Sequence, residues 1–175
     1  MRPTWADIDL EAIKHNVRQL TQVVSPATLC AVVKADGYGH GAVPVARAAV
    51  SAGASWLAVA LVEEGIVLRE AGINEPILLL SEPRPREMVQ VAEYDLRPTV
   101  YSGEGIAAAA AAATQVDKEI PVHLKIDTGM RRVGAEPELA LTLAKAISEK
   151  SSLSLDGLWT HCAVADIPSD PFTTK

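Results

Sequence analysis

The stretch most able to do chemistry is AVVKADGYGHGA, residues 31–42, in which a single lysine follows an apolar run. The ammonium group of Lys34 stands where a strand is expected to end, and a loop containing Tyr38 and His40 follows it. A lysine in such a place is commonly a surface charge whose stem packs on the strand. If the amine is desolvated there, its pKa falls and the neutral amine can form a Schiff base. Position alone leaves both interpretations open.

The loop after Lys34 contains three glycines, which allow either a simple turn or a close approach to a phosphate. The phenol of Tyr38 could hydrogen-bond such a phosphate. The glycine spacing matches neither the dinucleotide fingerprint nor a P-loop, because no Lys-Ser or Lys-Thr pair follows. A turn and a ligand site therefore fit the loop equally well.

A second cluster of charged residues occurs in VHLKIDTGMRRVG, residues 122–134. Lys125 lies on an expected strand that ends near Asp127, and Arg131 and Arg132 follow. The planar guanidinium group of arginine binds carboxylates through two parallel hydrogen bonds. The cluster could therefore hold a carboxylate or tune a cofactor ring, and a structural network of ion pairs is the alternative.

A third candidate is His161 in LWTHCAVAD, which follows another expected strand. Taken alone, such a histidine is more often a packing residue than a catalytic one. The adjacent Cys162 is expected to be a small buried residue, since nothing nearby would activate it as a nucleophile.

Short apolar runs and segments of helical periodicity alternate along the chain and must position these residues. Asp9 is an expected N-cap, and apolar residues recur at helical spacing from Leu10 to Val24. The segments LVEEGIVLREAGI and GEGIAAAAAAATQ are expected helices, the second by its alanine content, with a low-complexity linker as the alternative. The expected strands are Leu29–Val33, Trp56–Val59, Ile77–Leu80, Arg97–Val100, Val122–Ile126 and Leu155–Trp159.

Strands that are apolar at consecutive positions indicate a parallel sheet covered on both faces, as in a doubly wound sheet or a (β/α) barrel. A barrel has eight units in about 250 residues, and the spacing of these six units in 175 residues matches it. The predicted fold is therefore α/β, of the (β/α)8 TIM-barrel type, with about six of eight units in residues 1–175. Unpaired edges at the first and sixth strands predict self-association.

Composition excludes several classes of function. The net charge is −6 and basic residues are not clustered, which argues against a nucleic-acid partner. No apolar stretch approaches the roughly 20 residues of a membrane span, and the N-terminus lacks the apolar core of a signal peptide. Cys30 and Cys162 fit neither a disulfide framework nor a zinc motif. A cytoplasmic location is expected.

The motif AVVKADGYGHGA resembles the pyridoxal 5'-phosphate attachment signature of the alanine racemases. The resemblance continues in order through DIDLEAIKHN, AVALVEEGIVLREAGI, PILLLS, HLKIDTGMRRVG and GLWTHCAVAD, which together cover nearly the whole chain. It implies an N-terminal (β/α)8 barrel, a C-terminal β domain that is absent from these residues, and a homodimer with active sites between subunits.

The resemblance also implies roles for individual residues. Lys34 would form the internal aldimine with pyridoxal 5'-phosphate and then act as one of two acid–base groups, and Tyr38 would contact the phosphate. Arg132 would bind near the phenolic oxygen of the cofactor and the substrate carboxylate. Lys125 matches a position often carbamylated, where the new anion would orient Arg132. His161 would lie against the pyridine ring, and Leu80 would line the cofactor cavity.

The implied reaction is racemisation of alanine through a planar carbanion, which supplies D-alanine for cell-wall peptidoglycan. In the family, the second base is a tyrosine from the partner subunit's C-terminal domain. None of Tyr38, Tyr94 and Tyr101 lies in a matching motif, so these residues alone are expected to be inactive. Alternatives are a decarboxylase of basic amino acids with the same type of barrel, and a non-catalytic protein that binds the cofactor.

Overall fold

The computed structural model describes residues 2–174, which divide into two compact units, Met1–Leu78 and Leu79–Lys175. Each unit contains parallel strands that alternate with helices. No helix within residues 2–174 is long and apolar enough to cross a membrane.

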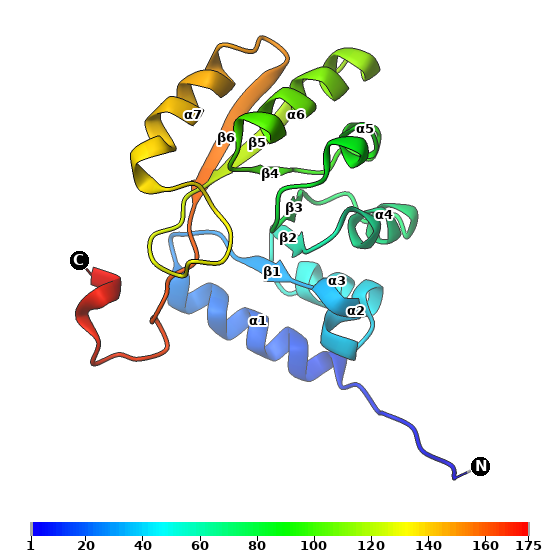
Figure 1. The fold of residues 1–175 in the computed structure, drawn as a ribbon. Coiled ribbons are helices and arrows are strands. Elements are labelled where there is room, and N and C mark those ends of the chain that lie inside the picture. The colour runs from blue at the N-terminus through cyan, green and yellow to red at the C-terminus, as the bar shows by residue number, and fades with distance from the viewer. Residues whose placement is uncertain (1, 175) are drawn as a thin grey trace. The chain divides into compact units, whose positions relative to one another are not determined.

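The first unit has a three-stranded sheet in the order β1-β2-β3, in which β1 and β2 are parallel with Cys30 opposite Trp56. Figure 1 shows its elements in blue to green. They are α1 (Leu10–Val24), β1 (Cys30–Val32), the turn labelled α2 (Lys34–Gly39), α3 (Ala42–Ser51), β2 (Trp56–Val59), α4 (Val62–Glu70) and β3 (Ile77–Leu79), whose last residue begins the second unit.

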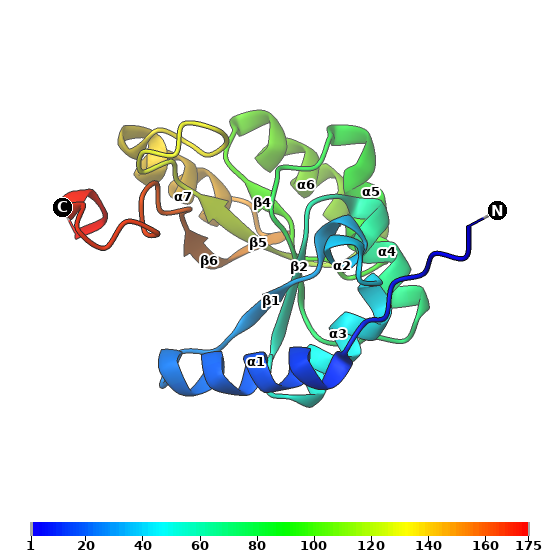
Figure 2. The ribbon, with the colours of Figure 1, turned by 90° about the horizontal axis from the view of Figure 1, so that it is seen from below.

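Helix α1 packs along β1 and α3 through its apolar face, as Figure 2 shows from below. Its N-cap is Asp9, whose carboxylate accepts hydrogen bonds from the backbone N–H groups of Glu11 and Ala12 at 2.9 and 3.0 Å. Val17 lies in a small core with Ala49 of α3. The apolar spacing of the sequence therefore produces the helix and also buries it.

The second unit has the strand order β4-β5-β6, and all pairs are parallel. Helices α6 and α7 lie beside β5 and β6 in Figure 1, and Leu124 of β5 and Ile147 of α7 are fully buried. The elements are α5 (Met88–Glu93), β4 (Thr99–Val100), α6 (Gly103–Val116), β5 (Ile120–Lys125), α7 (Ala140–Ser148) and β6 (Leu153–Trp159), with 3₁₀ turns at Pro85–Glu87, Pro137–Leu139 and Pro171–Thr174.

All six expected strands form, and the alanine-rich segment is the helix α6 and not a linker. Ser102 caps α6 by accepting a hydrogen bond from the N–H of Gly105 at 2.9 Å. Within the described residues, β1 and β3 lie at the outer positions of one sheet and β4 and β6 at those of the other, so the expectation that only the first and sixth strands have unpaired edges stays a prediction.

Gly157 on β6 leaves room for the imidazole of His123 on the neighbouring strand. A Cβ atom at position 157 would lie 2.6 Å from Nδ1 of His123, which also pairs through Nε2 with Asp156 at 3.3 Å. Gly157→Ala must therefore displace the ring, and we expect the free energy of unfolding to fall by roughly 1–3 kcal/mol. Urea denaturation measures this loss.

Gly103→Ala is the matched control, because no heavy atom lies within 4 Å of the added methyl group at the start of α6. Its stability should equal or exceed that of the unchanged chain, since alanine favours a helix. Adding His123→Ala to Gly157→Ala should recover part of the loss. Equal stabilities for Gly157→Ala and Gly103→Ala would show that the imidazole does not restrict this position.

Candidate active site

Lys34 lies two residues beyond the end of β1, at the start of a left-handed turn. Ala35, Asp36, Gly37 and Tyr38 all have φ between 50° and 62° and ψ between 37° and 51°. Each non-glycine residue in this conformation costs roughly 1–2 kcal/mol, and such residues normally occur singly. Four in succession need support from outside the turn, and strain of this kind concentrates at functional sites.

Side chains and backbone groups around the turn supply that support. The carboxylate of Asp36 accepts a hydrogen bond from the N–H of Ala42, the first residue of α3, at 2.7 Å. The N–H of Gly41 donates to the carbonyl of Asp36 at 2.8 Å, and Nδ1 of His40 donates to the carbonyl of Gly37 at 2.9 Å. Gly37 itself is buried. The glycine-rich loop is thus a tightly bonded structure and not a flexible segment.

The left-handed turn brings the side chains of Lys34 and Tyr38 together. Nζ of Lys34 lies 5.9 Å from the centre of the Tyr38 ring, at the outer limit of a cation–π contact. Tyr38 is 58% exposed and Lys34 is half-buried. Among the described residues no carboxylate pairs with the amine of Lys34, so the amine is available to a ligand.

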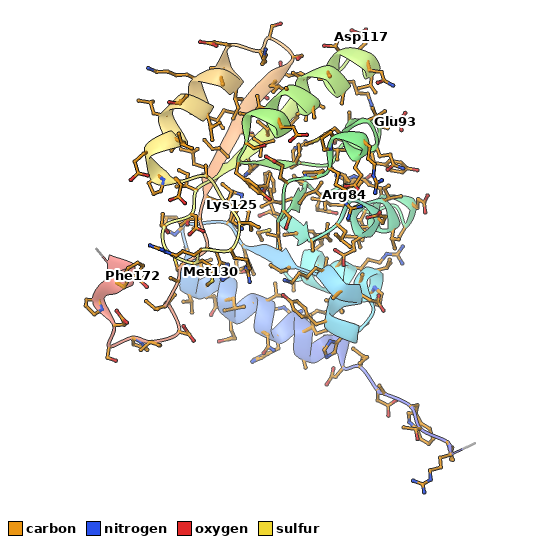
Figure 3. The ribbon with its side chains drawn as sticks, in the orientation of Figure 1. Arg84, Glu93, Asp117, Lys125, Met130 and Phe172 are labelled. Carbon is orange, nitrogen blue, oxygen red and sulfur yellow. The ribbon has the colours of Figure 1, made fainter. Side chains whose placement is uncertain are left out.

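Lys125 ends β5 and is almost completely buried, with 3% of its surface exposed. Its Nζ lies 4.0 Å from the centre of the Trp159 ring on β6, in a close cation–π contact. Nε1 of Trp159 donates to Oγ1 of Thr99 on β4 at 3.1 Å. The Trp159 ring is therefore held by β6, which carries it, and by Thr99 of β4. It contacts Lys125, which Figure 3 labels at the end of β5.

The loop after β5 is organised by Asp127. Its carboxylate accepts hydrogen bonds from the backbone N–H groups of Gly129, Arg131 and Arg132 at 2.9 to 3.2 Å. The N–H groups of Arg131 and Gly129 hold the pKa of Asp127 below its usual value, and the charge of Lys125 acts in the same direction. Asp127 therefore shapes the loop, and its carboxylate is not free to bind a ligand.

The side chain of Arg132 is exposed and makes no ion pair within residues 2–174. Arg131 and Arg132 line one hollow with Asp127 and Glu136. Lys125, by contrast, contacts Trp159. The charged residues that the sequence placed in one cluster therefore have two environments. Lys125 is buried against the Trp159 ring, whereas Arg131 and Arg132 are exposed on the loop whose N–H groups bind Asp127.

His161 and Cys162 lie two and three residues beyond the end of β6 and are both exposed. The expectation that Cys162 is buried is wrong, because the chain leaves the sheet at Trp159 and nothing within the described residues covers the thiol. Leu80 directly follows β3 and is half-buried.

Glu64 contacts the left-handed turn and was not among the residues predicted from the sequence. Its Oε1 accepts a hydrogen bond from the N–H of Ala35 at 2.7 Å. Its Oε2 accepts bonds from the N–H groups of Ala60 and Leu61 at 2.8 and 3.1 Å. A glutamate in the third position of a helix is the acceptor half of a capping box, which the segment LVEEG contains without the Ser or Thr at the N-cap. That signal predicts the bond to Leu61 but not the bond to Ala35.

Parallel strands that alternate with helices, with a free lysine amine just beyond the first strand, define an α/β protein whose candidate site lies at strand ends. A family model described as alanine racemase, N-terminal domain, matches residues 8–175. The chain belongs to the alanine racemase family, whose N-terminal domain is of the TIM-barrel type.

Individual relatives agree with this assignment. The chain is 44% identical over 173 residues to the alanine racemase of Symbiobacterium thermophilum, covering 99% of this chain and 46% of that protein. The alanine racemase of Clostridium difficile 630 in complex with cycloserine has a TM-score of 0.91 and 35% identity, covering 98% of this chain and 48% of that one. A histidine racemase from Leuconostoc mesenteroides has a TM-score of 0.87 and 29% identity, covering 94% and 45%. The chain spans about half the length of these relatives.

Proposed function

We propose that this chain is part of a pyridoxal-5'-phosphate-dependent enzyme that interconverts L-alanine and D-alanine. The observation that carries the proposal is the amine of Lys34, which makes no ion pair with any residue from 2 to 174 and lies beside Tyr38 on a hydrogen-bonded turn. When bound, pyridoxal 5'-phosphate is an electron sink that makes the Cα proton of an amino acid removable. Membership of the alanine racemase family supports the substrate.

The residues of the first unit fit the cofactor chemically. The primary amine of Lys34 would hold the aldehyde carbon of the cofactor, and, once the amino group of the substrate has displaced it, the freed amine would accept or donate the Cα proton on one face of the substrate. The exposed hydroxyl of Tyr38 donates a hydrogen bond to the phosphate. Because the left-handed turn fixes both side chains, the amine and the phenol are oriented before any ligand arrives.

From the resemblance to the family, we propose further roles for Arg132, His161, Leu80 and Lys125. The guanidinium group of Arg132, which has no ion-pair partner in the part of the chain that the structure describes, would bind the substrate carboxylate and hydrogen-bond near the phenolic oxygen of the cofactor. His161 would lie against the pyridine ring, and Leu80 would line the cavity. Carbamylation of Lys125 would replace the positive charge of its amine with a negative one, and the carbamate would orient Arg132.

Racemisation also needs an acid–base group on the opposite face. We propose that a tyrosine from the C-terminal domain of a partner subunit supplies it, in a cytoplasmic homodimer that provides D-alanine for peptidoglycan. None of Tyr38, Tyr94 and Tyr101 lies in a motif that matches this base. Residues 1–175 alone are therefore expected to lack turnover.

Product analysis tests the proposed reaction in the protein that contains this chain. Given L-alanine and pyridoxal 5'-phosphate, it should release D-alanine until the two enantiomers are nearly equal, and no carbon dioxide. L-Histidine and L-lysine should be poor substrates. Carbon dioxide as the product would instead establish the decarboxylase alternative, and bound cofactor without either product would establish a non-catalytic binding protein.

A further inference from the structure

The carboxylate of Glu64 connects two strand-end loops of the first unit. Glu64 is the third residue of α4, and its side chain reaches back across the start of that helix. One oxygen accepts hydrogen bonds from Ala60 and Leu61, which follow β2. The other accepts a bond at 2.7 Å from the N–H of Ala35, which follows β1. Three backbone donors therefore meet on one half-buried carboxylate.

The hydrogen bond from Ala35 to Glu64 joins the left-handed turn directly after Lys34. Ala35 directly follows Lys34 and is the first of the four left-handed residues, with φ 50° and ψ 51°. A non-glycine residue adopts this conformation only when its surroundings impose it. Two bonds restrain the turn at its Lys34 end, from the N–H of Ala35 to Glu64 and from the N–H of Gly37 to the carbonyl of Val33 at 3.0 Å, and the first is the one made by a side chain. The bond from Ala42 to Asp36 restrains the far end.

Only an ionised carboxylate can serve all three donors. Both of its oxygens accept hydrogen bonds, and a bond to a charged acceptor is shorter and stronger than one between neutral groups. A glutamine side chain has one accepting oxygen, and its NH₂ group would face an N–H donor at one end of the bridge. The single amide oxygen is expected to stay with the two N–H groups of Ala60 and Leu61, so the bond to Ala35 is the one that glutamine loses.

We propose that Glu64 is a positioning residue for Lys34. Its carboxylate holds Ala35 in the left-handed conformation and thereby fixes the direction in which the side chain of Lys34 leaves the strand end. The inference depends on the proposed function for the identity of Lys34 as the cofactor lysine. The hydrogen bonds themselves do not depend on it.

The test compares Glu64→Gln with Glu63→Gln in the 175-residue chain. Glu63 is the preceding residue of α4 and is exposed, so the control removes the same charge beside the same helix end. Hydrogen exchange of the ligand-free chain reports on the amides of residues 35–38. Labelling of Lys34 with formaldehyde and borohydride reports on its amine, and covalent capture of pyridoxal 5'-phosphate reports on its positioning.

In Glu64→Gln we expect the exchange of the amides of residues 35–38 to rise about tenfold or more, because a hydrogen bond to a charged acceptor is lost. The capture of pyridoxal 5'-phosphate by Lys34 should slow by a similar factor. Glu63→Gln should match the unchanged chain in both measurements. If Glu64→Gln does not fold, Glu64→Asp replaces it, because its carboxylate is one methylene too short to reach Ala35.

Two results would overturn the inference. Exchange in Glu64→Gln equal to that in Glu63→Gln would show that the carboxylate does not restrain the turn. Faster exchange with unchanged capture would show that the turn does not position Lys34. If the unchanged chain captures no cofactor, the proposed function fails instead. The exchange rates of residues 35–38 then decide by themselves whether Glu64 restrains the turn.

Discussion

Replacing Lys34 with alanine is expected to abolish the change in visible absorbance that pyridoxal 5'-phosphate undergoes when it binds this chain. The change requires a covalent bond between the aldehyde carbon and a primary amine. Within the first unit Lys34 offers that amine at the end of β1, free of ion pairs and beside Tyr38. The loss should be complete, because the remaining contacts with the phosphate are non-covalent. Absorbance titration of both chains measures the effect.

Two variants separate the amine from the positive charge. Lys34→Arg keeps the charge but should be as inactive as Lys34→Ala, because guanidinium stays protonated and cannot attack an aldehyde. Lys118→Ala removes an exposed lysine between α6 and β5 and should leave the titration unchanged. Retained absorbance in Lys34→Ala would assign the cofactor to another lysine.

The second large effect is expected for Gly134→Ala, in the loop that positions Arg132. Gly134 has φ 138°, and a Cβ atom there would lie 2.7 Å from the backbone nitrogen of Asp127. Backbone atoms cannot yield as the end of a flexible side chain can. The loop is closed beside Gly134 by two bonds, from Ala135 to the carbonyl of Lys125 and from Asp127 to the carbonyl of Ala135. The clash should break them and lower the free energy of unfolding by roughly 1–3 kcal/mol, in addition to the roughly 1–2 kcal/mol that alanine costs at a positive φ.

Gly72→Ala is the matched comparison for this clash. Gly72 also has a positive φ, 80°, but no heavy atom lies within 4 Å of the added methyl group. It should show only the conformational cost of roughly 1–2 kcal/mol for a left-handed residue. Urea denaturation should rank Gly134→Ala as the less stable variant, with faster amide exchange at residues 127–135. Equal losses would mean that the loop does not depend on the close approach of Gly134 to Asp127.

The sheet strands and the first helix were predictable because their signals are local. Consecutive apolar residues specify buried parallel strands, and Trp56–Val59 forms as expected. The recurrence of apolar residues from Leu10 to Val24 specifies one buried helical face, and the observed bounds of α1 are the same. Strand ends were less well defined, since pairing with a neighbour extends β6 back to Leu153.

The conformation after Lys34 could not be predicted from local preference. Ala35 and Asp36 ordinarily avoid positive φ, and only the glycines hinted at it. Ala35 donates to an acceptor that is distant in sequence, Glu64, 29 residues away, and no local preference indicates that contact. Likewise, Asp127 was predicted from the sequence to form a ligand site with Lys125, Arg131 and Arg132. In the structure its carboxylate accepts hydrogen bonds from backbone N–H groups.

The candidate residues themselves were found from their places at strand ends and from their resemblance to a family. Membership of that family is confirmed by the match over residues 8–175. The roles of Tyr38, Arg132 and His161 toward a cofactor stay predictions. The structure adds physical reasons for two of the choices: a free amine beside a phenol on a rigid turn, and a guanidinium group with no protein partner among the described residues.

The most direct test of the central claim is to locate the cofactor on the chain. The 175-residue chain is incubated with pyridoxal 5'-phosphate, reduced with borohydride, digested and analysed by peptide mass spectrometry. If Lys34 binds the cofactor, we expect one label per chain, on Lys34 within AVVKADGYGHGA. Label distributed over exposed lysines such as Lys118 and Lys150, or no label at all, would contradict it.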